Sequence, residues 1–165
     1  MQAAQKLGTK FEDTVHEKLV QSNYFDEVLR EKEIIKRYSR SITTCDHAVF
    51  FDKYIITIQD KWEESTPIGN LVKSFIKDSR RLAIKSKKQL LYGLYVSKKP
   101  FTLNANDVIK TENDDEDEYI FYNITNSTSI DALSDDVVKF IQDKLIIMGL
   151  LKDNVDITWI LKDHQ

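Results

Sequence analysis

A continuous apolar run at residues 89–97, QLLYGLYVS, constrains the fold more than any other stretch of the chain. It has neither a helical stripe nor a regular alternation of apolar and polar residues, which is typical of a β-strand covered on both faces. Such a strand needs helices on both sides of its sheet. The run therefore predicts a central strand in an α/β domain.

Amphipathic helices are predicted to flank this strand. In residues 7–22, Phe11, Val15 and Leu19 recur every four residues, so they share one face of a helix. Later segments show the same spacing. Further helices are predicted over residues 67–86 and 129–149, with a short helix before the acidic run 114–118, itself expected to be a solvated loop.

Two apolar segments that flank Asp52 and Lys53 predict a β-hairpin. The first is DHAVFF and the second is KYIITIQDKW. A short polar break between two apolar runs is typical of a turn that joins antiparallel strands. We therefore expect two paired strands here.

Two further strands complete the predicted sheet. In residues 24–38, Val28, Ile34 and Ile35 alternate roughly with charged side chains, which predicts a strand followed by polar chain. Residues 119–125, YIFYNIT, predict the last strand. The predicted order is helix, two or three strands, helix, strand, helix, strand and helix.

The composition is that of one globular domain. The 165 residues are 41% hydrophobic and 31% charged, which is enough to bury a core, and no repeat divides them, so we expect one domain over residues 1–165. Cys45 has no second cysteine to pair with, and no apolar run approaches the roughly 20 residues of a membrane span. Together with the lack of a signal peptide, this favours a cytoplasmic or nuclear protein with no membrane partner.

The net charge of −3 conceals an asymmetry along the chain. Residues 1–100 hold 19 of the 24 Lys and Arg against 13 acids, whereas residues 101–165 hold 5 against 14. The first part is cationic on balance and the second is strongly acidic. This division allows a cationic surface on an acidic protein.

Three polar side chains are predicted to converge at one end of the hairpin. Alternate residues of a strand share a face, so Gln59 and Lys61 point one way and Asp60 points the other. Asp46 begins the paired strand, and hairpin pairing would bring its carboxylate beside Gln59 and Lys61. The Asp60 carboxylate would need a separate partner or a water on the covered face, so its backbone carbonyl is the favoured metal contact.

These residue types have a chemical use in common. A carboxylate oxygen of Asp46 and an amide oxygen of Gln59 are hard ligands suited to Mg²⁺. The cation would neutralise a phosphodiester and help to ionise an attacking water, while Lys61 could orient that water or stabilise developing negative charge. The pattern predicts hydrolysis of nucleic acid with Mg²⁺, for which Mn²⁺ could substitute.

The arrangement resembles the active-site signature of the PD-(D/E)XK nuclease superfamily. Asp46, followed at hairpin distance by Gln59 and Lys61, is similar to the branch related to Mrr, the type IV restriction endonuclease, in which Gln replaces the acid of (D/E)xK. The segment GTKFE resembles the G-x-x-F-E of that branch's opening helix, and IQDKW resembles its catalytic strand. LLYGLYVSKKPFT resembles the strand that follows.

The resemblance covers about residues 5–105 and implies a restriction-endonuclease-like core, a mixed central sheet flanked by helices. The acidic residues 106–165 would complete the sheet and helices. Members of this superfamily often act as homodimers, so the helix over residues 129–149 could pair two chains or could cover the sheet.

The same resemblance implies a Mg²⁺-dependent deoxyribonuclease acting on DNA. In this reading Glu12 joins Asp46 and Gln59 around the metal, and Lys61 assists the attacking water. From the sequence alone, Glu12 could equally be solvated or pair with His16 four residues later.

Cations outside the apolar stripe of the helix over residues 67–86 are candidate DNA contacts. A charged run is often only a solvated helix face. This one directly follows the proposed site and supplies much of the positive excess, which favours contacts with phosphate. The residues are Lys73, Lys77, Arg80, Arg81 and Lys85.

Two alternative functions stay open. Compact nuclease cores also serve structure-specific enzymes such as Holliday-junction resolvases. A domain of this kind could instead have lost catalysis and bind DNA or protein, because Gln59 in place of an acid weakens the hold on Mg²⁺. His47, next to Asp46, is either structural or a contact for phosphate or a proton.

Overall fold

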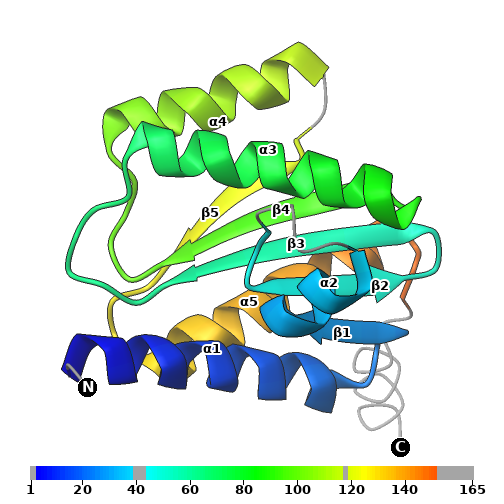
Figure 1. Ribbon diagram of the computed structural model, residues 1–165, viewed down its shortest axis with the longest axis horizontal. Helices are drawn as coiled ribbons and strands as arrows, with labels where there is room; N and C mark the ends of the chain where they lie inside the picture. The colour runs from blue at the N-terminus through cyan, green and yellow to red at the C-terminus, as the bar shows by residue number, and fades with distance from the viewer. Residues whose placement is uncertain (1–2, 39–43, 117–118, 152–165) are drawn as a thin grey trace, which may run out of the picture.

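One mixed five-stranded sheet organises the part of the chain that the computed structural model describes, residues 3–38, 44–116 and 119–151 (Figure 1). In spatial order the strands are β1 (Glu27–Arg30), β2 (His47–Phe51), β3 (Tyr54–Lys61), β4 (Gln89–Ser97) and β5 (Phe121–Thr125). β1, β2 and β3 pair antiparallel, whereas β3, β4 and β5 run parallel. The parallel strands therefore all end at the same edge of the sheet, at the left in Figure 1.

Helices cover both faces of this sheet (Figure 1). α1 (Ala3–Ser22) and α5 (Ile130–Ile147) lie together on one face, and α3 (Gly69–Ser86) and α4 (Leu103–Glu116) lie on the other. α2 (Glu31–Tyr38) packs beside β1 and β2 on the face that carries α3. The predicted α/β class, with a mixed central sheet flanked by helices, is confirmed.

The alternation of side chains along the strands divides the interior into two cores. In β2 and β3, Val49, Ile56 and Ile58 pack against the apolar stripes of α1 and α5. Phe50 and Ile55 point the other way and pack with α3. Because strand side chains alternate between faces, the polar residues that follow in β3 are also sorted to opposite sides.

The predicted hairpin is confirmed at Asp52 and Lys53. Asp52 has a φ of 53°, in the left-handed region that aspartate tolerates better than most residues. Its backbone N–H donates to Asp26 Oδ2 at 2.7 Å, and its carbonyl accepts from Lys88 Nζ at 2.8 Å. The turn is thus fastened from both flanking segments, which sets the register that brings the start of β2 to the end of β3.

β4 is the buried interior strand that its apolar run predicts. It lies between β3 and β5, and seven of its residues, 91–97, are buried. The helix after β5 covers the sheet with Leu133, Val137 and Ile141. Of the two uses predicted for this helix, the structure therefore shows the one in which its apolar face covers the sheet.

Residues 31–38 correct the sequence prediction. The strand ends at Arg30, and Ile34 and Ile35 belong to α2 instead of continuing a strand. Glu33 Oε1 accepts the backbone N–H of Arg30 at 3.1 Å, which caps the helix. Acids in the first turn and bases in the last turn favour the helix further. The few alternating apolar residues predicted a strand, but capping and charge at the two ends of the segment stabilise a helix instead.

α4 also extends further than predicted, since it includes residues 114–116 of the acidic run. Residues 117 and 118 of that run lie outside the described residues. Just before it, the buried Asn113 accepts the backbone N–H groups of Ile120 and Phe121 and donates to the Phe121 carbonyl. This amide ties the end of α4 to the start of β5. No helix in the described segments is long and apolar enough to cross a membrane.

A glycine in the middle of β4 tests this packing. A Cβ at Gly93 would lie 2.5 Å from the Phe121 ring and 3.3 Å from Thr57 Oγ1. We expect Gly93→Ala to destabilise the protein by about 1–3 kcal/mol, measured by urea unfolding, because the ring must shift within a packed core.

Gly8 provides the matched control for this substitution. A Cβ at Gly8 would have no atom within 4 Å, and the residue lies inside α1. Gly8→Ala should therefore stabilise the protein by up to about 1 kcal/mol. An equal effect of the two substitutions would contradict the packing at Gly93.

Candidate functional site

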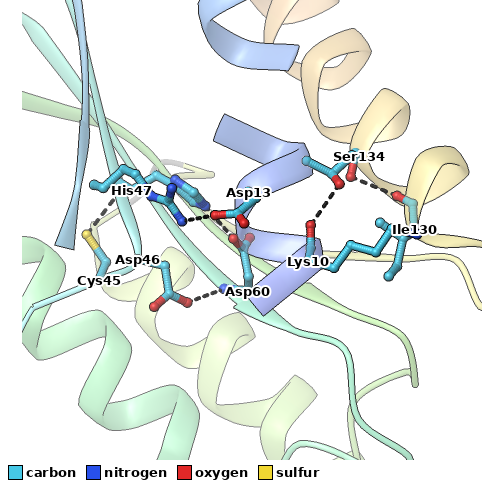
Figure 2. Close-up of polar contacts among 10 residues, drawn as sticks. Lys10, Asp13, Cys45, Asp46, His47, Asp60, Ile130 and Ser134 are labelled. Atoms are coloured by element: carbon cyan, nitrogen blue, oxygen red, sulfur yellow. Dashed lines mark hydrogen bonds and ion pairs between the residues drawn. The ribbon is translucent and has the colours of Figure 1, made fainter. Parts of the chain in front are cut away.

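The carboxylate of Asp46 is held against the backbone of β3. Asp46 Oδ2 accepts the backbone N–H of Asp60 at 2.7 Å (Figure 2). Asp60 is the residue between Gln59 and Lys61, so this bond brings Asp46 to the predicted Gln-x-Lys segment. Hairpin pairing predicts the Asp46 carboxylate beside the Gln59 and Lys61 side chains, but in the structure those two side chains line a different cavity from Asp46.

The local strand pairing explains the position of Asp46. His47 pairs with Ile58 as the last step of the β2–β3 ladder, and Asp46 precedes this pair by one residue. The backbone N–H of Asp46 still donates to the Ile58 carbonyl at 3.0 Å. The main chain is therefore fixed on both sides of the carboxylate.

Glu12 and Asp46 line one groove between α1 and the β1–α2 segment. Its volume is about 610 Å³. Arg30, which lines the same groove, forms an ion pair with Asp13. The groove is lined by Thr9, Glu12, Asp13, Arg30, Glu31, Lys32, Glu33 and Asp46. The two acids that the resemblance assigns to a metal thus share one solvent-accessible space.

Gln59 and Lys61 line a smaller cavity of about 130 Å³ on the side of the sheet that carries α3. The cavity is completed by Thr44, Leu71, Ser74, Phe75, Asp78 and Tyr95. The pKa of Tyr95 is raised to about 12 by burial and by the negative charges of Glu63 and Asp46. Asp46 therefore acts electrostatically on this cavity as well as on the groove beside α1.

The pKa of Asp46 is raised from 3.8 to about 7, first by burial and then by the charge of Asp60. Glu12 contributes to the same shift, and the hydrogen bond from the Asp60 backbone opposes it. Burial and Asp60 also raise the pKa of Glu12. Both acids are therefore in surroundings where a nearby cation would favour the ionised form.

A fully buried ion pair lies behind Asp46, on the side of β3 where α1 packs. His47 Nε2 contacts Asp60 Oδ2, and both side chains are excluded from solvent (Figure 2). Burial by itself lowers the pKa of His47, but the Asp60 carboxylate, together with Asp46 and Glu12, outweighs it and the net shift of the pKa is upward. The His16 ring stacks on His47 with centroids 6.0 Å apart. Of the roles predicted for His47, these contacts fit the structural one, because the ring holds the Asp60 side chain in place.

The pairing of His47 with Asp60 was not predicted, although the strand register contains the signal for it. His47 pairs with Ile58 across the hairpin, and Asp60 lies two residues beyond Ile58 on the same face. Side chains at such diagonal positions reach one another across a sheet. Applying the alternation rule to β2 as well as β3 would have named His47 as the separate partner that Asp60 needs.

Cys45 is placed where it cannot act as a nucleophile. Its thiol is buried, donates to the His47 carbonyl at 3.2 Å, and has a pKa raised to about 12 by burial. A thiol protonated at neutral pH is a poor nucleophile.

The residues at this end of the hairpin fit a divalent cation in donor type. Asp46 and Glu12 offer carboxylate oxygens and Gln59 offers an amide oxygen, all hard ligands. Their positions do not form a three-acid cluster. In the described segments, no group of three or more His, Cys, Asp or Glu side chains could hold an ion. Asp46 and Glu12 share a groove that Gln59 does not line, so a cation at the two acids would need the Gln59 amide to turn toward them and would take its remaining ligands from a backbone carbonyl and water.

The five cations on α3 that were predicted to contact DNA do not share one face of the helix. Lys73 and Lys77 line a groove of about 420 Å³ against α4. Arg81 and Lys85 follow Ser74 and Asp78 at helical spacing, so they continue the stripe that faces Gln59 and Lys61. The structure therefore splits this set between two sides of the helix.

Arg80 differs from the other four cations because it joins α3 to α4. Its Nε donates to Glu112 Oε1 at 2.6 Å, and its guanidinium lies 5.3 Å from the centroid of the Phe121 ring. The side chain is 32% exposed. These contacts link α3 to α4 and β5, so Arg80 stabilises the packing of these elements.

Comparison of the chain with protein-family models, with curated proteins and with solved structures found no match.

The raised pKa of Asp46 predicts how stability depends on pH. A carboxyl group with a higher pKa in the folded protein than in the unfolded chain contributes stability that is lost as pH rises through the folded pKa. Here that window runs from 3.8 to about 7. Asp46→Asn keeps an oxygen for the Asp60 N–H but cannot ionise, so the variant should gain stability over the wild type across this window.

Urea unfolding in metal-free buffer at intervals across that window would measure this difference. A difference between the variant and the wild type that stays constant with pH would show that the carboxyl group titrates normally.

The buried pair of His47 and Asp60 predicts strong coupling between two substitutions. His47→Leu alone leaves a buried carboxylate without its partner and should cost about 3–5 kcal/mol of unfolding free energy. Adding Asp60→Val removes that charge, so the double variant should be less destabilised than the sum of the single variants by about 1–3 kcal/mol. Urea unfolding of the four proteins measures this coupling, and simple additivity would contradict a direct pair.

Proposed function

We propose that the chain is a metal-dependent DNA endonuclease of the PD-(D/E)XK type, similar to the catalytic domain of Mrr-like enzymes. The observation that carries the proposal is the hydrogen bond from the Asp60 backbone to Asp46. It fixes the acid to the main chain between the amide and the lysine, at the end of one hairpin. Glu12 supports the proposal because it shares a groove with Asp46.

The order of elements also supports a restriction-endonuclease-like core. A helix that carries Glu12 precedes an antiparallel hairpin, and a helix then leads to a strand parallel to the hairpin's second strand. The proposed site lies where β3 ends and β2 begins. In open α/β sheets, ligands commonly bind beyond the carboxyl ends of the strands.

Each proposed residue has a distinct role. Asp46, Gln59 and Glu12 would hold Mg²⁺, which when bound supplies charge neutralisation at the phosphodiester and lowers the pKa of water. Lys61 would orient the attacking water or stabilise charge on the phosphate. Its amine lies 3.6 Å from Glu63 Oε1, and its side chain is 28% exposed and lines the cavity of Gln59.

The cations of α3 suggest how DNA would be held. Arg81 and Lys85 extend the helix stripe that borders the cavity of Gln59 and Lys61, which supports contact with a strand that leaves the cavity along α3. Lys73 and Lys77 would contact phosphate only if DNA also follows the groove beside α4. We therefore propose Arg81 and Lys85 as the stronger phosphate contacts of the set.

A nuclease-like binding module is the second candidate. Gln59 contributes no negative charge, and the described residues hold no cluster of three acids, so the predicted affinity for Mg²⁺ is modest. Such a domain would still bind DNA through its cations. Divalent-ion dependence separates this reading from an active enzyme.

The nuclease proposal is tested by DNA cleavage in Mg²⁺ and, separately, in Mn²⁺. Linear duplex, methylated duplex and a four-way junction should be supplied in parallel, since the core serves enzymes of each kind. We expect cleavage of at least one DNA, and Asp46→Asn and Lys61→Gln should each reduce its rate by about 100-fold or more. Lys110→Gln, at an exposed lysine on α4, is the matched control and should retain the rate.

Thermal unfolding with and without Mg²⁺ gives a readout independent of cleavage. A cation held by Asp46 should raise the melting temperature of the wild type and raise that of Asp46→Asn much less. Stabilisation without cleavage would favour the binding module. Undiminished cleavage by both site variants would refute the site assignment.

A further inference from the structure

Three lysines gather at the edge of the sheet where β3 and β4 end. Lys61 is the last residue of β3 and pairs with Ser97, the last residue of β4. Lys98 and Lys99 follow at once, and the backbone N–H of Lys98 donates to the Lys61 carbonyl at 2.9 Å. Parallel pairing thus brings together cations that lie far apart in the sequence.

The chain supplies its own carboxylates to these amines. Glu64 forms ion pairs with both Lys98 and Lys99, the second at 3.4 Å from Lys99 Nζ to Glu64 Oε2. Glu63 Oε1 lies 3.6 Å from Lys61 Nζ. The three amines outnumber the two carboxylates, so the cluster stays cationic even with these pairs formed.

The lysines are held more firmly than the acids that neutralise them. The side chains of Lys98 and Lys99 are 21% and 37% exposed, whereas that of Glu64 is 73% exposed. Lys98 Nζ also lies 5.2 Å from the centroid of the Trp62 ring, which packs on Phe11. The acid is therefore the partner that can leave at little cost.

The backbone beneath the two lysines is also fixed. Ser97 Oγ donates to the Lys99 carbonyl at 2.7 Å, and Thr125 Oγ1 donates to the Lys98 carbonyl at 3.3 Å. Asn123 Nδ2 donates to Ser97 Oγ at 3.0 Å, which links this turn to β5. The positions of the cations are thus set by the neighbouring strands before any ligand arrives.

We propose that Lys98 and Lys99, together with Lys61, bind the phosphodiester backbone of DNA, and that Glu64 occupies this site as an internal counterion until a phosphate replaces it. The proposal rests on the proposed function, because Lys61 borders the cavity of Gln59. It adds two residues that raise the affinity for DNA, Lys98 and Lys99, and an internal competitor that lowers it, Glu64.

A nucleic acid backbone fits this cluster better than an acidic protein. The three amines lie together at the edge where β3 and β4 end, whereas Arg81 and Lys85 lie toward the other end of α3, near the start of β4. Lysine binds phosphate as a point charge, without the fixed geometry that arginine uses for carboxylates. Neutralising phosphates also releases counterions, which makes binding sensitive to salt.

The test measures binding alone, by fluorescence anisotropy of a short DNA duplex in EDTA over a series of salt concentrations. Glu64→Gln should bind about two- to threefold more tightly than the wild type, because a surface ion pair that competes with DNA is removed. Lys98→Gln/Lys99→Gln should bind more weakly, with the slope of log affinity against log salt reduced in magnitude by about 1.8.

Charge-matched controls separate a local site from a change in net charge. Asp143→Asn on α5 makes the same change in charge as Glu64→Gln, and Lys110→Gln/Lys139→Gln matches the double lysine variant at exposed positions on α4 and α5. Both controls should shift the affinity less than their counterparts. Melting temperatures of all variants confirm that they fold.

The possible results distinguish failure of this proposal from failure of the nuclease proposal. The proposal is overturned if the controls shift the affinity as much as Glu64→Gln and the double lysine variant do, or if neither the wild type nor Glu64→Gln binds DNA. Failure of the nuclease proposal looks different, since DNA would then bind with the expected variant effects while no divalent ion supports cleavage.

Discussion

The candidate site depends on one residue of β3, Asp60, which is bound in two directions. Its backbone N–H holds the Asp46 carboxylate at 2.7 Å, and its side chain is paired with the buried His47. Because breaking either contact would leave a buried charged or polar group without its partner, the end of the hairpin resists distortion. The geometry of Asp46 relative to Gln59 and Lys61 follows from this anchor.

Acidic side chains lie on one side of Asp60 and lysine side chains on the other. Asp46 and Glu12 lie in the groove beside α1, where burial and the nearby charge of Asp60 raise the pKa of both carboxyl groups. Lys61 and Lys98 lie at the carboxyl ends of the parallel strands, with Glu63 and Glu64 as their counterions. An arrangement of acids beside amines suits a ligand that combines a cation with a phosphodiester, which is the chemistry of the proposed nuclease.

Local sequence patterns predicted most of the fold because they report burial directly. The stripe of Phe11, Val15 and Leu19 and the apolar run at 89–97 both belong to the described cores. The prediction was wrong at residues 31–38, where capping by Glu33 and the distribution of charge decide for a helix. It also ended α4 too early, because the anchoring role of Asn113 is visible only once β5 lies beside it.

The sequence by itself determined the α/β class, the hairpin and the order in which Glu12, Asp46, Gln59 and Lys61 occur, since apolar periodicity and turn residues are local properties. Only the tertiary structure decided which polar groups meet. The pairing of His47 with Asp60, the split of the α3 cations and the meeting of Lys61 with Lys98 all require strand register and helix packing. Contacts between distant segments depend on how the whole chain packs, which no short window of residues records.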